Sequence, residues 1–282
     1  MIARPPDKIP LPGFHVLKDH WSQRSYLEYD CRTLMGDGQL KSALAVTLEA
    51  APKRTQGYVP PRLERAYKLP EDMSEDSKER RLEAGLFAKY GHASSPPVSG
   101  LWDRLVYFQV PLFNSRNKGG WGCIDLLALT AQGEPVIIEL KIAESGDTPL
   151  HALLEAATYA TVLRSNWDRV AQELRDFSSA EDLSLPVSDD PQRWPIVLLA
   201  PPAYWNRCSK GVTGSFDCAE AFCELCDRFG GEDDQPMPVH FAEVRGASDW
   251  DGMTVPEPER LSVAAREVAW LPRRPTVNPG GG

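Results

Sequence analysis

The chain has 282 residues and a mass of 31.3 kDa, enough for one large domain or two small ones with a core that needs no disulfides. Hydrophobic residues make up 42% and charged residues 25%, which excludes a collagen-like or wholly disordered chain. Forty acidic and 31 basic residues give a net charge of -9. This excludes a protein coated in positive charge, so any nucleic acid must contact a local basic groove.

The sequence contains no apolar run of the about 18 residues that span a bilayer, so no membrane association is expected. The start, MIARPPDKIPLPG, has prolines where a secretory signal needs an apolar stretch. The six cysteines are therefore expected to be reduced thiols, and the protein is expected to be cytoplasmic. Nothing in the sequence sets the oligomeric state.

Three regions are distinguished along the chain. Residues 1–70 are expected to form an N-terminal extension that could pack on the core. Two segments within it fit strands or short helices equally well. Residues 71–247 carry a regular succession of elements and form the core domain. Residues 248–282 are polar and proline-bearing, and we expect them to form a C-terminal tail, either a frayed end or a peripheral wrap.

The core domain begins with an amphipathic helix and continues with three strands, a long helix, a strand, a helix and a last strand. Their expected ranges are 74–91, 105–113, 123–129, 136–143, 149–177, 194–201, 217–229 and 239–244. This order predicts an α/β (α+β) fold with a mixed central sheet flanked by helices.

The second and third of these strands carry unexpected charges. Glu139 and Lys141 share one face of the very apolar run VIIELKIA, and Asp125 is the only charge in the run CIDLLAL. Burying an unpaired charge costs several kcal/mol, at least about 3, so these groups need partners.

The turn between the two strands decides whether the charges meet. A three-residue loop ending in a left-handed Gly133 would place Asp125 opposite Glu139, with their Cβ atoms about 5 Å apart. A two-residue loop would place Asp125 opposite Leu140 and put the two carboxylates on opposite faces. Because a glycine ends the loop, we predict the first register.

Two carboxylates this close repel each other unless a cation lies between them. Their oxygen ligands suit Mg²⁺, which usually takes one or two protein carboxylates together with phosphate oxygens of a substrate. Lys141 could then hold or help to deprotonate a water, or neutralise a phosphate. The chemistry that these groups indicate is metal-assisted hydrolysis of a phosphodiester. The alternative is a buried ion pair that only stabilises the sheet.

The run GCID that ends at Asp125, thirteen further residues, and then ELK from Glu139 to Lys141 resemble the core of the PD-(D/E)XK nuclease superfamily. The order of elements over roughly residues 75–205 also matches its restriction-endonuclease-like αβββαβ core. The resemblance implies that Asp125 and Glu139 bind Mg²⁺ or Mn²⁺ together with the main-chain carbonyl of Leu140. It also implies that Lys141 activates water.

The resemblance extends to the two helices around these strands. Glu83 lies where many members carry an additional glutamate, which gives it a helper role in catalysis. RecB-like members have a Gln-x-x-x-Tyr pair on the following helix, and Tyr159 matches its tyrosine. The chain has Glu155 in place of the glutamine, and the role of that position stays open.

Basic residues near the first hairpin suggest where DNA could bind. Arg104, Arg116 and Lys118 lie on or beside it, interleaved with aromatic residues that could stack on bases. The alternative for each of them is a solvated position at the tip of the hairpin.

Two further groups could suggest metals. Cys218, Cys223 and Cys226, with Cys208 and Cys31 upstream, resemble the early and late cysteines of nucleases that carry an iron–sulfur cluster. Their spacing in a phenylalanine-rich helix favours core packing over such a cluster or zinc. The histidines show no spacing typical of metal ligands, and a surface role is favoured for His151.

The sequence therefore predicts a Mg²⁺-dependent deoxyribonuclease that binds DNA in a local groove. The alternative from another class is a catalytically inactive module of the same fold that binds nucleic acid or a protein partner. The sequence does not distinguish endonuclease from exonuclease.

Overall fold

The structure, a computed structural model, describes residues 27–36, 38–55, 75–91, 95–112, 122–180, 184–210, 217–231, 236–246, 250, 252 and 254–266. Its elements are, in chain order, α1 (Leu27–Met35), α2 (Gln39–Ala50), α3 (Glu75–Tyr90), β1 (Arg104–Pro111), β2 (Cys123–Leu129), β3 (Pro135–Leu140), α4 (Pro149–Arg164), α5 (Trp167–Ala180), β4 (Ile196–Ala200), α6 (Pro202–Lys210), α7 (Asp217–Gly231), β5 (Val239–Arg245), the 3-10 helix η3 (Pro258–Arg260) and β6 (Ser262–Ala265). Within these described ranges, no helix combines the length and the apolar character needed to cross a membrane.

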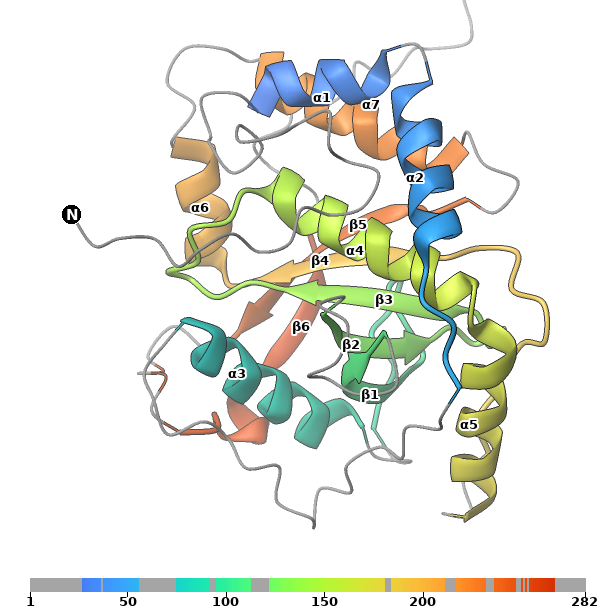
Figure 1. The fold of residues 1–282 in the computed structure, drawn as a ribbon. Helices are drawn as coiled ribbons and strands as arrows, with labels where there is room; N and C mark the ends of the chain where they lie inside the picture. The colour runs from blue at the N-terminus through green and yellow to red at the C-terminus, as the bar shows by residue number, and fades with distance from the viewer. Residues whose placement is uncertain are drawn as a thin grey trace, which may run out of the picture.

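The strands form one six-stranded sheet in the order β1-β2-β3-β4-β5-β6 (Figure 1). The pairs β1/β2 and β2/β3 are antiparallel, β3/β4 and β4/β5 are parallel, and β5/β6 is antiparallel again. The predicted α/β architecture with a mixed central sheet is therefore confirmed. Strand β3 lies in the middle of the sheet and every one of its residues is buried, as expected for a strand covered on both faces.

Helices cover both faces of the sheet (Figure 1). The larger hydrophobic cluster contains residues of α1, α2, α4, α5, α6 and α7 together with one face of the strands. The smaller cluster contains Leu82, Leu86 and Phe87 of α3 and the opposite face, including Ile138 and Leu140. The alternation along β3, with Ile138 and Leu140 toward α3, therefore points Glu139 toward α4.

The three-residue loop and the register predicted for the β2–β3 hairpin are confirmed from Leu126 to Leu129, but the ladder ends before the expected pair of Asp125 and Glu139. Leu126 pairs with Ile138 and Leu129 with Pro135, and Gly133 has the left-handed φ of 81° that a three-residue loop needs. A Cβ at Gly133 would also lie 2.7 Å from the backbone nitrogen of Ser188, so the loop admits no other residue without rearrangement.

The single long helix expected over 149–177 is wrong, because the chain makes two helices separated by Ser165 and Asn166. The Asn166 side chain donates from Nδ2 to the carbonyl of Pro52 and accepts at Oδ1 from the Arg54 N–H, each within 2.9 Å. Short polar side chains compete with the helix for backbone groups in this way. These two hydrogen bonds hold the segment that follows α2 against the junction of α4 and α5.

The first helices and the last strand of the described chain both pack against the core domain, which is more than the sequence predicts. In the N-terminal extension, α1 packs on α7 and α2 packs on α4, so residues 27–35 and 39–50 are helical. Most of the first segment whose structure was open precedes residue 27 and lies outside the described residues. In the expected C-terminal tail, β6 extends the sheet beside β5. Leu261, just before β6, is fully buried against α3, so this part of the tail belongs to the core.

Candidate functional site

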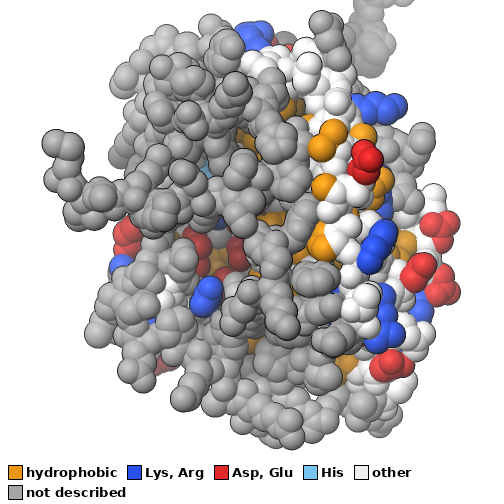
Figure 2. All heavy atoms as spheres, viewed as in Figure 1, with side chains coloured by type: hydrophobic (Ala, Val, Ile, Leu, Met, Phe, Trp, Pro, Cys, Tyr) orange, Lys and Arg blue, Asp and Glu red, His pale blue; other side chains and the backbone are white. Residues whose placement is uncertain are grey.

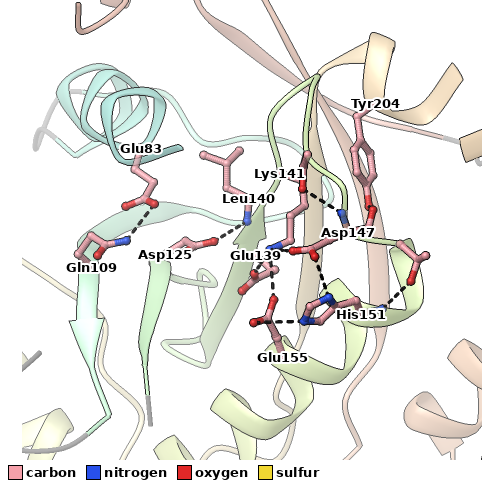
Figure 3. A network of polar contacts seen from close by, with 12 residues as sticks. Glu83, Gln109, Asp125, Glu139, Leu140, Lys141, Asp147, His151, Glu155 and Tyr204 are labelled. Carbon is pink, nitrogen blue, oxygen red and sulfur yellow. Dashed lines mark hydrogen bonds and ion pairs between the residues drawn. The ribbon is translucent and has the colours of Figure 1, made fainter. Parts of the chain in front are cut away.

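Asp125 lies where β2 and β3 separate. The ladder between the two strands runs only as far as Leu126 and Ile138. One position further, Asp125 Oδ2 accepts a hydrogen bond from the Leu140 N–H at 2.9 Å (Figure 3). Where the two strands separate, the carboxylate thus accepts the hydrogen bond that a backbone carbonyl would accept in a regular ladder. Burial, followed by the charge of Glu83, raises its pKa well above the usual range.

Glu83 reaches the same place from α3, on the other side of the sheet. Its side chain is buried, and Oε1 accepts a hydrogen bond from Gln109 Nε2 at 2.9 Å. Its other oxygen, Oε2, is buried and has no hydrogen-bond partner. Burial raises the pKa of Glu83 to about 8. The helper position implied by the resemblance is therefore brought beside Asp125.

Gln109 was not identified from the sequence. It is the partner of Glu83 and has a φ of 50°, a left-handed conformation that is rare for a residue with a side chain. Such strain persists only where the surroundings impose it, and it concentrates at functional sites. The signal that could have found Gln109 is the one that Asp125 gives, a single polar side chain within an apolar strand.

Glu139 is the second carboxylate of the predicted pair. It is 3% exposed, and Oε1 accepts from Lys141 Nζ at 2.8 Å while Oε2 is buried without a hydrogen-bond partner. Burial raises its pKa, and the charge of Asp125 raises it further. Glu83, Asp125 and Glu139 thus come from three elements and oppose one another's ionisation, as expected where a cation is needed.

Lys141 is buried among carboxylates. Its Nζ lies 2.8 Å from Glu139, 3.2 Å from Glu155 and 3.3 Å from Asp147. Burial disfavours the ammonium, but these carboxylates, Glu139 foremost, hold the pKa of Lys141 well above its ordinary value. Lys141 donates hydrogen bonds here to Glu139 and Glu155.

A second group of side chains adjoins Lys141 at the start of α4. His151 Nδ1 lies 2.9 Å from Asp147 Oδ1, and its Nε2 lies 3.5 Å from Glu155 Oε1. His151 is 4% exposed, so the surface role favoured from the sequence is wrong. Burial lowers the pKa of His151, but the charge of Glu155 and the contact with Asp147 raise it to about 9.

The four side chains of Lys141, Asp147, His151 and Glu155 form a closed ring of alternating charge (Figure 3). Each carboxylate offers one oxygen to Lys141 and the other to His151. Asp147, which no motif in the sequence marks, has its pKa lowered by His151 and Lys141 despite its burial. Glu155, whose role was open, links the predicted site to this ring.

Tyr159 lies one helical turn beyond Glu155. It is buried, and its hydroxyl would be 2.9 Å from a Cβ at Gly122, the residue just before β2. Gly122 has a φ of 78°, so both its backbone and the nearby tyrosine require glycine. Burial, and then the charges of Glu155 and Glu139, raise the pKa of Tyr159. The tyrosine thus borders the group of carboxylates, where the resemblance implies it should be.

The predicted DNA contacts are less well placed. Arg104 pairs with Leu129 at the end of β1 remote from Gln109, so it does not lie beside the carboxylates. Arg116 and Lys118 fall outside the described residues. Figure 2 shows basic side chains over α5, but Arg169 there is paired with Glu173 at 3.6 Å.

The cysteines follow the core-packing interpretation where they are described. Cys31, Cys208 and Cys226 are buried in the larger hydrophobic cluster, and Cys223 is half-buried. Burial raises the pKa of Cys226, as expected for a cysteine that packs in the core. The side chain of Cys218 lies outside the described residues.

Comparisons with protein-family models, with curated proteins and with solved structures found no match to this chain. A function can therefore be inferred only from the residues of the site. The residues fit a divalent metal ion, because two buried carboxylate oxygens without hydrogen-bond partners, Glu83 Oε2 and Glu139 Oε2, flank Asp125.

Proposed function

We propose that this protein is a Mg²⁺-dependent nuclease of the PD-(D/E)XK type that hydrolyses phosphodiester bonds of DNA. The observation that carries the proposal is the pair of buried, unpartnered oxygens of Glu83 and Glu139 on either side of Asp125. Buried carboxylates without partners are costly unless protonated or bound to a cation. DNA as the substrate rests on the resemblance of the sequence motif.

Asp125 and Glu139 would hold the metal ion, with the Leu140 carbonyl as a third ligand and Glu83 as a helper. A bound Mg²⁺ supplies Lewis-acid polarisation of the phosphate and lowers the pKa of a water. The Leu140 N–H donates to Asp125 at 2.9 Å and orients this carboxylate. Orientation of this kind strengthens a metal ligand.

Lys141 would serve as an electrostatic group. Its ammonium, held by Glu139 at 2.8 Å, can donate a hydrogen bond to the attacking water or to a phosphate oxygen. Asp125 and Asp147 are partly exposed while Glu139 and Lys141 are buried. Substrate would therefore approach from the side on which these two aspartates reach solvent.

The test is cleavage of single- and double-stranded DNA with and without Mg²⁺ or Mn²⁺. We expect metal-dependent cleavage by the wild type and a fall of at least about 100-fold in Asp125→Asn and Lys141→Ala. Glu134→Gln is the matched control, since this carboxylate lies in the turn of the same hairpin, remote from the site, and should leave cleavage unchanged.

A wild-type protein that binds DNA equally with and without metal, and cleaves none, would instead support the non-catalytic module. Metal-dependent cleavage retained by both variants would show that another site is responsible.

A further inference from the structure

The residues Asp147, His151 and Glu155 bring three potential metal ligands together beside the proposed nuclease site. Each can offer one ligand atom so that the three atoms all lie within 4.8 Å of one another. The set is one imidazole nitrogen and two carboxylate oxygens. Three protein ligands with positions left for water are common in metal sites of proteins.

The backbone helps to hold this group in place. Thr148 caps α4 by accepting a hydrogen bond from the His151 N–H at 3.2 Å. The Tyr204 hydroxyl, from α6, donates to the carbonyl of Asp147 at 3.1 Å. His151 and Glu155, four residues apart on α4, lie on one face of the helix. Asp147 lies in the loop just before the cap of α4 and is held beside them by the contact of its Oδ1 with His151 Nδ1 at 2.9 Å.

The balance of charge also favours a second cation. Three carboxylates, Glu139, Asp147 and Glu155, surround the single ammonium of Lys141. Either a proton on His151 or a metal ion must supply the next positive charge. Glu139, which is 3% exposed, lies beside Lys141 and Glu155 (Figure 3) and adds its negative charge to this group.

We infer that Asp147, His151 and Glu155 form a second metal site, which takes a late transition-metal ion such as Zn²⁺. The imidazole determines this class, because Mg²⁺ prefers oxygen ligands and keeps its waters, whereas nitrogen ligands suit the later divalent metals. The shortest contact of Lys141, at 2.8 Å, is with Glu139 and not with any of these three residues. The inference goes beyond the proposed function and does not depend on it.

The first experiment measures Zn²⁺ affinity by competition with a chromophoric chelator in the full-length protein. We expect the wild type to bind Zn²⁺, and the affinity of His151→Gln and of Glu155→Gln to fall at least about tenfold. His240→Gln is the matched control, since this half-buried histidine lies on β5 and should leave the affinity unchanged. Asp125→Asn removes a ligand of the proposed nuclease site and should also retain Zn²⁺ binding.

The second experiment identifies the ligand directly. Pulsed EPR of the Asp125→Asn variant loaded with one equivalent of Cu²⁺ should detect a nitrogen nucleus coordinated to the ion, and adding His151→Gln should abolish this signal. Circular dichroism of each variant checks that the fold is retained.

Failure to bind Zn²⁺ at about 0.1 mM, or unchanged affinity in both His151→Gln and Glu155→Gln, would overturn the inference. Loss of Zn²⁺ binding only in Asp125→Asn would assign the ion to the nuclease site and would also overturn it. None of these outcomes depends on DNA cleavage, so the two proposals fail separately.

Discussion

The carboxylate of Asp125 accepts the backbone N–H of Leu140 at 2.9 Å, so a side chain of β2 completes the hydrogen bonding of β3. The ladder between these strands ends at the preceding pair. The strands separate at this point, and the gap between them contains an acidic side chain. An apolar residue at position 125 would leave the Leu140 N–H without this acceptor.

Metal binding should stabilise the folded protein through Asp125. At a Mg²⁺ concentration 100 times the dissociation constant, the free energy of unfolding should rise by about 2.7 kcal/mol. We expect Asp125→Asn to lose this increase while folding normally, since an asparagine oxygen can still accept from Leu140. Thermal unfolding with Mg²⁺ and with EDTA measures the difference. An equal increase in the variant would contradict a role for Asp125 as a ligand.

Glu83 should make the metal-free protein less stable as the pH rises. Its pKa is about 8 in the folded protein against 4.5 normally, so the folded state keeps a proton that the unfolded state loses. The free energy of unfolding is therefore highest below pH 4.5 and falls by at most about 5 kcal/mol as the pH rises from 4.5 to 8. Glu83→Gln should flatten this dependence, which urea unfolding in EDTA at several pH values measures. A dependence equally steep in the variant would refute the assignment.

Removing the ammonium of Lys141 should destabilise the protein strongly. Lys141→Met leaves Glu139, Asp147 and Glu155 without their shared cation, and breaking a buried ion pair in this way costs about 3–5 kcal/mol. The double variant Lys141→Met/Glu155→Gln should recover part of the loss, because one repelling charge is gone. Equilibrium unfolding of the wild type, both single variants and the double variant measures this coupling, and strict additivity would argue against it.

His151 should stabilise the metal-free protein most at low pH. Its pKa of about 9 exceeds the usual 6.5, so its contribution is fully present below pH 6.5 and is lost as the pH rises through 9. The contribution is at most about 3 kcal/mol. The difference in unfolding free energy between wild type and His151→Gln should therefore shrink from pH 6 to pH 10. A constant difference would show that His151 is neutral in the folded protein.

The C-terminal segment should contribute to the stability of the core. Leu261 is fully buried, and Leu261→Ala should lower the free energy of unfolding by about 2–5 kcal/mol through the cavity it leaves. Chemical denaturation measures the loss. Glu259→Ala, two residues earlier and exposed, is the matched control. A cost below about 0.5 kcal/mol for Leu261→Ala would show that β6 packs loosely.

The β2–β3 hairpin could be predicted closely because its determinants are local. Gly133 sets the loop, alternation sets the faces, and single charges in apolar strands mark Asp125 and Glu139. Neither the strand order nor the pairing of β6 has such a local determinant. The four-residue β6 is identified only by its contact with β5.

The ring around Lys141 was missed for a similar reason. Asp147 and His151 lie in and after a loop, and their approach to Lys141 depends on how the chain turns back from β3 into α4. No periodicity in the sequence encodes that turn. The clue that was available is the glutamate at position 155, because a buried carboxylate next to Glu139 requires an additional cation nearby.

Sharing of both Asp147 and Glu155 between Lys141 and His151 has an evolutionary consequence. A lineage that replaced Glu155 with glutamine would remove one of the two carboxylates that favour the charged form of His151. A lineage that lost His151 would leave Glu155 with Lys141 alone, a cation that it shares with Glu139 and Asp147. Positions 151 and 155 should therefore covary among descendants of this chain, with histidine accompanying glutamate and neutral residues accompanying glutamine.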